Sequence, residues 1–250
     1  MLRKFFDANR RLCDRIEASL PHDFTLNFNR LFIDTVAARI NGTRGKIVVD
    51  VGAGKTCHFL PRLAPESRPV LVGVDVAEEE IRENRDLAMR LVGDVALGPL
   101  FRANSIDFLV SRSVVEHLPD NAAFVAHSAR ALRSGGYFIH LFPGRYAPFA
   151  VINRLLPDAV ARALLYFFFP EFREPCGFKA FYDRCYYSAM VKALTENGLV
   201  VERIHLRYYQ SLYFKFFVPF YLVSLLYDLL VYWLGVKNLG SQLLVVATKP

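Results

Sequence analysis

The sequence predicts an α/β fold of the Rossmann-like kind, in which a mostly parallel β-sheet carries helices on both faces. A β-branched run at 47–51 leads into a glycine turn, and a second apolar run at 70–75 ends in an acidic residue. A strand, a glycine turn, a helix and a second strand with a terminal carboxylate form a nucleotide-binding βαβ unit. Further apolar runs of strand length alternate with helical patterns, and 250 residues suit one α/β domain with additions.

The glycine turn is the most informative feature of the chain. In Gly52-Ala53-Gly54 the glycines let the backbone approach a ligand, and the terminal Asp75 can accept both hydroxyls of a ribose. Two other nucleotide-binding loops fit less well. A P-loop requires a glycine where Val49 stands, and the third glycine of a G-x-G-x-x-G loop would fall on Cys57. A tight βα turn without any ligand stays open as an alternative.

Hydrophobic periodicity and stop signals define the other elements. Two helices are expected before the sheet, and Asn41-Gly42 ends the second of them. The predicted helices cover 2–20, 27–41, 78–86, 121–133 and 187–196. The predicted strands cover 47–51, 70–75, 91–94, 106–111, 137–142, 199–204 and 241–248.

A series of motifs between residues 46 and 143 resembles that of class I S-adenosylmethionine-dependent methyltransferases, in the branch with the quinone-biosynthesis and type 11 enzymes. Asp50, Gly52 and Gly54 match the motif D-x-G-x-G, with Thr56 where the family usually has a third glycine. The other matches are Asp75, Gly93-Asp94-Val95, the strand 105–111, the "LEH-x-x-D" segment 114–120 and the double-glycine turn in 131–139. The resemblance implies a seven-stranded sheet whose last strand is antiparallel. An apolar helical insert before that strand is expected from the composition of the chain itself.

The same resemblance implies S-adenosyl-L-methionine as the cofactor and assigns roles to individual residues. Asp50 would orient the loop and approach the amino-acid end, Asp75 would hold the ribose, and Asp94 would meet the adenine. Arg112, at the end of the fourth strand, can also reach the cofactor. The residues expected to bind the cofactor are Asp50, Gly52, Ala53, Gly54, Asp75, Val76, Asp94, Val95 and Ser111.

Methyl transfer needs an acceptor atom in line with the departing sulfur, and a general base can remove the acceptor proton. The candidate bases are His117, just after the fourth strand, and His140, near the end of the fifth, although a lone histidine is more often structural. The candidate substrate-binding residues are Tyr146, Tyr182, Asp183 and Arg184. A plain salt bridge between Asp183 and Arg184 is the competing interpretation. The sequence shows no metal-ligand constellation, so no metal is expected.

Composition narrows the possible partners. The chain has a formal charge of +7, 53% hydrophobic residues and 14% aromatic residues, which suits nucleic acid or an anionic membrane surface. No catalytic Asn/Asp-Pro-Pro-Tyr/Phe motif is present, so a nucleic-acid methyltransferase is the less favoured alternative. The four cysteines show no C-x-x-C spacing, which indicates reduced thiols. Without a long apolar signal region at its start, the chain is expected in the cytoplasm, at or near the inner face of the membrane.

Residues 211–238 form an apolar insert between the last two predicted strands. Its apolar stretch of about 20 residues is long enough for a membrane span. However, one crossing would separate the two strands, two need roughly 40 residues, and Asp228 would cost about 3 kcal/mol in the hydrocarbon core. We therefore expect an in-plane or shallow re-entrant element, flanked by Lys215 and Lys237 at the lipid headgroups. A helical cap or a homodimer interface would also bury this surface and stays open.

The chain is thus expected to be a single methyltransferase domain with four parts. Residues 1–45 supply the leading helices, 46–143 bind the cofactor, 144–198 cover the substrate, and 199–250 hold the last strands and the insert. In the family that the chain resembles, the segment after the fifth strand covers the acceptor. Because residues 147–172 are apolar and aromatic, the resemblance implies a small hydrophobic or lipid-linked acceptor, methylated at an oxygen, nitrogen or carbon atom. A plain place in the hydrophobic core is the alternative for these aromatic side chains. A non-catalytic module that keeps the fold is the remaining alternative.

Overall fold

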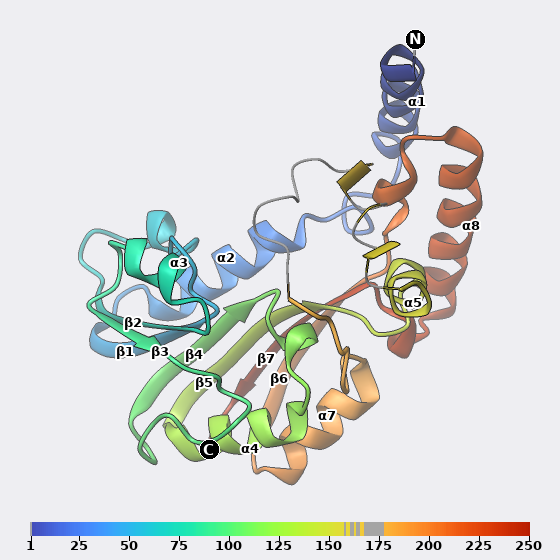
Figure 1. The fold of residues 1–250 in the computed structure, drawn as a ribbon. Helices are drawn as coiled ribbons and strands as arrows, with labels where there is room; N and C mark the ends of the chain where they lie inside the picture. The colour runs from blue at the N-terminus through green and yellow to red at the C-terminus, as the bar shows by residue number, and fades with distance from the viewer. Residues whose placement is uncertain (1, 158, 161–162, 164–165, 168–177) are drawn as a thin grey trace.

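A seven-stranded sheet forms the centre of the molecule, in a computed structural model that describes residues 2–157, 159–160, 163, 166–167 and 178–250 (Figure 1). The strand order is β3-β2-β1-β4-β5-β7-β6, in which β7 runs antiparallel to both its neighbours and the other pairs are parallel. This is the Rossmann-like sheet that the sequence predicts. The strands are β1 (Arg44–Val51), β2 (Arg68–Asp75), β3 (Met89–Val92), β4 (Ile106–Arg112), β5 (Leu132–Pro143), β6 (Val200–Arg207) and β7 (Gln242–Thr248).

Helices cover both faces of this sheet. The α-helices are α1 (Leu2–Glu17), α2 (Phe28–Ile40), α3 (Glu78–Glu83), α4 (Asn121–Ala131), α5 (Pro148–Leu155), α7 (Tyr187–Glu196) and α8 (Val218–Leu234). Short 3₁₀ turns are η1 (Leu60–Arg62), η2 (Val115–His117), η4 (Ser211–Phe214) and η5 (Lys237–Leu239). Most boundaries differ from the prediction by a few residues, and two strands illustrate this. β3 begins at Met89 instead of 91, and β5 begins at Leu132, where a helix to 133 was expected.

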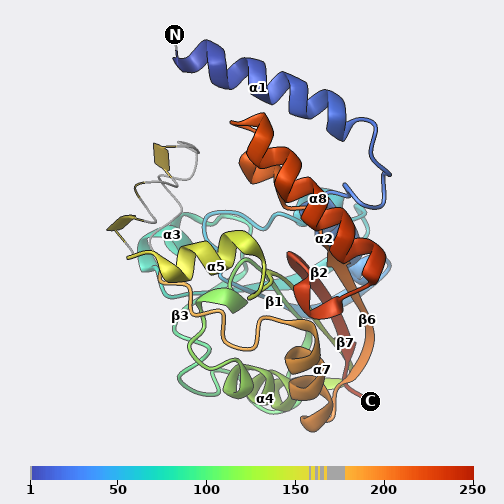
Figure 2. The same ribbon diagram turned by 90° about the vertical axis from the view of Figure 1, so that its right-hand side faces the viewer.

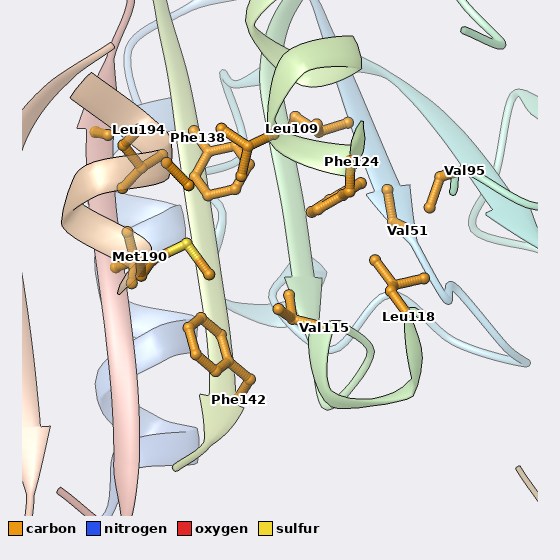
Figure 3. Packing of buried hydrophobic residues seen from close by; sticks show 14 of the residues in the cluster. Val51, Val95, Leu109, Val115, Leu118, Phe124, Phe138, Phe142, Met190 and Leu194 are labelled. Atoms are coloured by element: carbon orange, nitrogen blue, oxygen red, sulfur yellow. The ribbon is translucent and has the colours of Figure 1, made fainter. Parts of the chain in front are cut away.

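Side chains that alternate along β5 separate the core into two layers. Phe138 and Phe142 pack with Met190 and Leu194 of α7 (Figure 3), whereas Ile139 on the opposite face packs among residues of α2 and α3. This two-sided burial is what a central strand of an α/β sheet requires, because both of its faces are covered.

A third cluster lies beyond the sheet, where α1 and α8 meet (Figures 1 and 2). Cys13 of α1 packs with Tyr221 and Leu225 of α8. Among the described residues, no helix is long and apolar enough to cross a membrane. The predicted insert 211–238 contains a 17-residue helix, α8, that lies beside α1, with η4 before it and η5 after it.

The acidic residue inside α8 anchors this helix to the rest of the chain. Asp228 is fully buried, and its carboxylate accepts four hydrogen bonds from η4 and the residue before it. The donors are Gln210 N at 2.8 Å, Gln210 Nε2 at 3.2 Å, Ser211 N at 2.9 Å and Ser211 Oγ at 2.7 Å. The charge that interrupts the apolar sequence thus faces inward, and the apolar residues around it are left on the outer face of α8.

Candidate cofactor and acceptor site

The turn after β1 is fixed by hydrogen bonds to the end of β2. The amide nitrogen of Gly52 donates to the carbonyl oxygen of Val74 over 2.7 Å, and that of Gly54 donates to Asp75 Oδ2 over 3.0 Å. Gly52 has a φ of +69°, and a Cβ there would lie 2.3 Å from Cγ2 of Val114. Only glycine satisfies both the backbone conformation and the close approach of Val114.

Asp75 joins the glycine turn to the end of β3. Its Oδ1 accepts from Ala77 N over 2.9 Å, while Oδ2 accepts from the glycine turn. Each carboxylate oxygen keeps a further lone pair for a ribose hydroxyl. The carbonyl oxygen of Asp75 also accepts from Gly93 N over 2.9 Å, which brings Asp94 next to it at the sheet edge. Asp94 Oδ1 in turn accepts from Ala96 N over 2.8 Å.

A hollow of about 360 Å³ opens beside the glycine turn, and Asp50 and Arg112 bring opposite charges to it. Asp50 is only 9% exposed, and this burial raises its pKa to about 7. A hydrogen bond from the Cys57 thiol and the charge of Arg112 act in the opposite direction. Burial lowers the pKa of Arg112, and the charge of Asp50 opposes that shift. The hollow therefore offers one acidic and one basic group to a ligand. Its lining is Phe32, Asp50, Gly52, Ala53, His58, Phe59 and Arg112.

Three residues expected to bind the cofactor are placed differently. Val95 is buried in the hydrophobic core and lines a separate apolar cavity of about 310 Å³ beside α4. Ser111 is fully buried, with its Oγ 2.6 Å from Nδ1 of His140. Val76 is 52% exposed. The side chains of Val95 and Ser111 thus face the interior, which leaves their backbone as the part that a ligand can meet.

His140 lies inside the core instead of at the acceptor end. Its ring packs at 3.8 Å between centroids on Phe138 and at 5.4 Å on Phe124. Burial lowers the pKa of His140 to about 3, so the imidazole is neutral at physiological pH. This ring is fully buried and neutral, and Phe138 and Phe124 pack on it, so it presents no surface to an acceptor. The structure therefore argues against the catalytic role expected for His140.

His117 contacts the segment 178–186 and lies next to the buried carboxyl group of Glu116. Its Nδ1 lies 3.0 Å from the carbonyl oxygen of Lys179, and its Nε2 lies 3.9 Å from Oε1 of Glu116. Burial lowers the pKa of His117. Glu116 itself is only 5% exposed, and burial raises its pKa to about 8. The sequence analysis selected His117 as a candidate base. In the structure the neighbouring Glu116 is the more deeply buried of the two side chains.

The four expected substrate residues divide into two groups. Tyr182 is buried, and the hydrogen bond that its side chain makes is to Asn153 of α5. Tyr146 is 39% exposed and packs on another tyrosine. Asp183 Oδ2 instead accepts from Asn121 N over 2.9 Å and from Arg184 Nη1 over 2.7 Å. The Asp183–Arg184 pair thus ties this segment to the start of α4, in agreement with the salt-bridge interpretation.

Several residues of the site could not be selected from the sequence. Phe32 comes from a helix that precedes the sheet, and His58 and Phe59 come from the loop after the glycine turn. No motif marks them, because only the folded chain brings α2 to this edge. Glu116 was visible as part of the "LEH-x-x-D" match, but its burial depends on the distant segment 178–186 and was not visible.

Comparison with known proteins supports the class of protein that this fold and site indicate. Residues 49–140 match a family described as a methyltransferase domain, of type 11. Over these residues the chain is similar to a methyltransferase domain of type 11, in agreement with the S-adenosylmethionine-dependent methyltransferase class and the cofactor that the sequence predicts. The match does not single out the quinone-biosynthesis branch. No curated protein matches the chain.

Solved structures share the fold at low sequence identity. A chain from the Haloferax volcanii complex of a methyltransferase activator with a methyltransferase has a TM-score of 0.56 and 18% identity, over 100% of this chain and 98% of that one. Geranyl diphosphate C-methyltransferase from Streptomyces coelicolor, in complex with S-adenosyl-L-homocysteine, has a TM-score of 0.52 and 13% identity, over 87% and 79%. A Mesorhizobium loti S-adenosylmethionine-dependent methyltransferase has a TM-score of 0.51 and 16% identity, over 86% and 96%.

Proposed function

We propose that S-adenosyl-L-methionine binds along the carboxyl edge of β1, β2 and β3. Asp75 accepts the two ribose hydroxyls with the lone pairs that its backbone donors leave free. Asp94, which follows β3, meets the adenine amino group. Gly52 and Gly54 of the glycine turn have positive φ and no side chain, so the backbone of the turn can approach the ligand closely.

The hollow beside the turn suits the amino-acid end of this cofactor. That end is a zwitterion, and the hollow presents a carboxyl group from Asp50 and a guanidinium from Arg112. Asp50 would pair with the ammonium group. The positive charge of that group would lower the raised pKa of Asp50 and so favour its ionised carboxylate. Arg112 would pair with the carboxylate. The buried Asp50 and the half-buried Arg112, which bring opposite charges to one hollow, are the observation that supports this placement.

The bound cofactor supplies a methyl group on a cationic sulfur. The chain holds the acceptor in line with that methyl and excludes water from the reacting atoms. We propose that 46–143 form this cofactor-binding core within a single domain of 1–250, with 1–45 as leading helices. Residues 144–198 cover the acceptor, as expected from the sequence. Residues 158, 161–162, 164–165 and 168–177 of this segment, which include Cys176, lie outside the described residues.

The acceptor that we propose is a small hydrophobic or lipid-linked molecule, and the outer face of α8 is the observation that supports it. One stripe of this helix exposes only large apolar side chains, at positions three or four residues apart. Among them Val223 is 72% exposed, Leu226 is 70% exposed and Trp233 is 74% exposed. An apolar stripe of this kind marks an interaction surface. The full stripe is Phe220, Val223, Leu226, Leu230 and Trp233.

The partner proposed for this stripe is an anionic membrane surface, because cations flank it. Lys4, Arg11 and Arg15 of α1 are exposed beside α8, and Lys237 is exposed just after its end. Lys215, also expected at the headgroups, instead forms ion pairs with Asp14 and Glu17 of α1. A position at the inner face of the membrane stays a prediction from the sequence.

Flotation with phosphatidylcholine–phosphatidylglycerol vesicles tests this surface. Wild type is expected to float, and a variant with glutamate at Val223, Leu226 and Trp233 is expected to stay at the bottom, because each charge must leave water. The control carries glutamate at three exposed apolar positions elsewhere, which are Met89, Leu97 and Val200.

The control variant should float like wild type, and vesicles of phosphatidylcholine alone should bind less protein. Equal flotation of wild type and the α8 variant would contradict the proposal. A wild-type dimer that the α8 variant converts to a monomer, without any flotation, would assign the stripe to a homodimer interface instead.

A label-transfer assay tests the acceptor class. The chain, S-adenosyl-L-methionine labelled at its methyl group and a total lipid extract are incubated together. Label is expected in the organic phase, because the proposed acceptor is apolar or lipid-linked. Label that enters only water-soluble compounds or added RNA would refute the apolar acceptor and leave the methyltransferase assignment intact.

A further inference from the structure

Glu116 has a buried carboxyl oxygen without a partner. The residue is 5% exposed, and Oε2 has no hydrogen-bond partner among the described residues. Buried polar atoms in proteins are almost always paired, so an unpaired carboxyl oxygen calls for an explanation. A ligand that donates a hydrogen bond to this oxygen would supply the missing partner.

Three segments far apart in the sequence enclose this carboxyl group. The backbone of η2 is fixed to the segment 178–186, because the carbonyl oxygen of Glu116 accepts from Phe181 N over 2.8 Å and from Tyr182 N over 3.0 Å. Tyr182 and Cys185 of that segment and Tyr213 of η4 are close enough for Glu116 to raise the pKa of each. These side chains, two of them aromatic, surround the carboxyl group, and this set of residues is called the chamber below.

The chamber adjoins the helix that covers it. The Tyr182 side chain hydrogen-bonds to Asn153 of α5, and the ring of Phe149 on α5 packs 4.9 Å from that of Tyr213. Figures 1 and 2 show α5 and α8 on the same side of the molecule. An apolar molecule held at the α8 surface would thus be on the same side as the chamber.

The backbone around Glu116 is held in an unusual conformation. Among non-glycine residues of the described chain, positive φ occurs at four positions, and three of them flank this chamber: Ser113 at +58°, Tyr182 at +53° and Arg184 at +48°. Strain of this kind collects at functional sites, where the surrounding structure has to enforce it. Asn121 does so here, since its Nδ2 donates to Val115 O over 2.9 Å and to Asp183 O over 2.6 Å.

The chamber is also next to the proposed cofactor site. Val114, two residues before Glu116, is the side chain that a Cβ at Gly52 would strike. The turn η2 therefore begins against the glycine turn and continues into the chamber. Glu116 therefore lies between the proposed cofactor site and the segment proposed to cover the acceptor, where a proton acceptor would act.

We propose that Glu116 is the general base for a hydroxyl acceptor on an apolar body, an inference that rests on the proposed function. The acceptor oxygen forms a bond to the methyl carbon as the bond from that carbon to sulfur breaks. The electron pair of the broken bond stays on sulfur, which leaves neutral S-adenosyl-L-homocysteine. The hydroxyl proton moves to Oε2 of Glu116, and His117, whose Nε2 lies 3.9 Å from Oε1, offers a partly exposed route to water.

The ionisation of Glu116 supports this role. Burial raises its pKa to about 8, and the titratable groups that face it are Tyr182, Cys185, Tyr213 and His117. A base with a pKa near the working pH is suited to proton transfer. Because only the ionised form accepts a proton, the rate of transfer should rise with pH up to about 8.

The test measures the carboxyl group directly, with the whole chain carrying ¹³C-labelled glutamate side chains. One carboxyl carbon should titrate near pH 8 in wild type, and this signal should be missing from Glu116→Gln. In the complex with S-adenosyl-L-homocysteine, the probe 4-octylphenol should shift the signal, whereas its methyl ether should not. A wild type in which no glutamate titrates above about pH 6 would overturn the proposal, as would a signal that the phenol leaves unchanged.

Transfer to the same phenol gives a second readout. Glu116→Gln should bind S-adenosyl-L-methionine like wild type but lose about 100-fold or more in the rate of transfer, together with the rise toward pH 8. Glu116→Asp should restore part of the rate, and Glu196→Gln, an exposed change on α7, should behave like wild type. Glu116→Gln with the wild-type rate would refute the base. A wild type that does not bind S-adenosyl-L-methionine would instead refute the proposed function.

Discussion

Replacing Asp228 with alanine is expected to lower the free energy of unfolding by about 4 kcal/mol. The carboxylate accepts two backbone and two side-chain hydrogen bonds from Gln210 and Ser211. Removing it leaves these donors buried without a partner, and each unsatisfied group costs about 1–3 kcal/mol. Urea unfolding of the variant and wild type, followed by circular dichroism, measures the difference.

Two further variants isolate the cause. Asp228→Asn keeps one oxygen acceptor in place and should lose only part of the stability. Leu226→Ala removes an exposed side chain from the same helix and should change the stability by less than about 0.5 kcal/mol. If Asp228→Ala unfolds at the wild-type urea concentration, the carboxylate does not hold α8 on the protein.

Asp75→Ala is expected to weaken the binding of S-adenosyl-L-methionine by at least about 100-fold. In our account the carboxylate accepts both ribose hydroxyls, and a hydrogen bond to a charged group contributes about 1.5–3 kcal/mol. The substitution also removes the acceptor for Gly54 N and Ala77 N, so the turn itself loses support. Isothermal titration calorimetry with each protein measures the change in affinity.

Asp75→Asn separates the two contributions, because it keeps the shape of the side chain and one oxygen acceptor. Its affinity should fall between those of wild type and Asp75→Ala. Glu79→Ala, an equal change of charge at an exposed site on the neighbouring helix α3, should leave the affinity unchanged. An Asp75→Ala variant that is folded and binds as tightly as wild type would show that the ribose lies elsewhere.

Much of the fold was predictable because its signals are local. The glycine turn, the acidic strand end at Asp75 and the helix 187–196 are each specified by residues close in sequence. The start of β5 was not predicted, because Leu132 continues the helical pattern of α4 and only its pairing with Ile106 of β4 places it in the sheet. Long-range pairing of this kind has no short-range signal.

The site was predicted less completely, for the same reason. Glycines and acids at strand ends identify the cofactor edge, but charge and burial depend on which segments meet. Arg112 was not among the selected site residues, and its role depends on the buried Asp50 beside it. The burial of Glu116 depends on the segment 178–186, which packs against it. His140 was selected because of its residue type, yet strand alternation puts it on the side of Phe138 and Phe142, within the core.

The apolar insert shows how one residue can reverse a prediction from hydropathy. By composition the stretch could span a membrane, and Asp228 was counted only as a cost of insertion. In the fold that carboxylate is the anchor that turns one side of α8 inward and leaves Val223, Leu226 and Trp233 outside. The in-plane expectation is thus consistent with the geometry of α8, while contact with lipid stays a proposal.

Calorimetric titration of the wild-type chain with S-adenosyl-L-methionine tests the central claim most directly. Our account predicts saturable binding at one site per chain, displaced by S-adenosyl-L-homocysteine and lost in Asp75→Ala. A folded wild type that binds neither compound, or that binds a nicotinamide dinucleotide at this site instead, would contradict the assignment of the glycine turn and Asp75 to this cofactor.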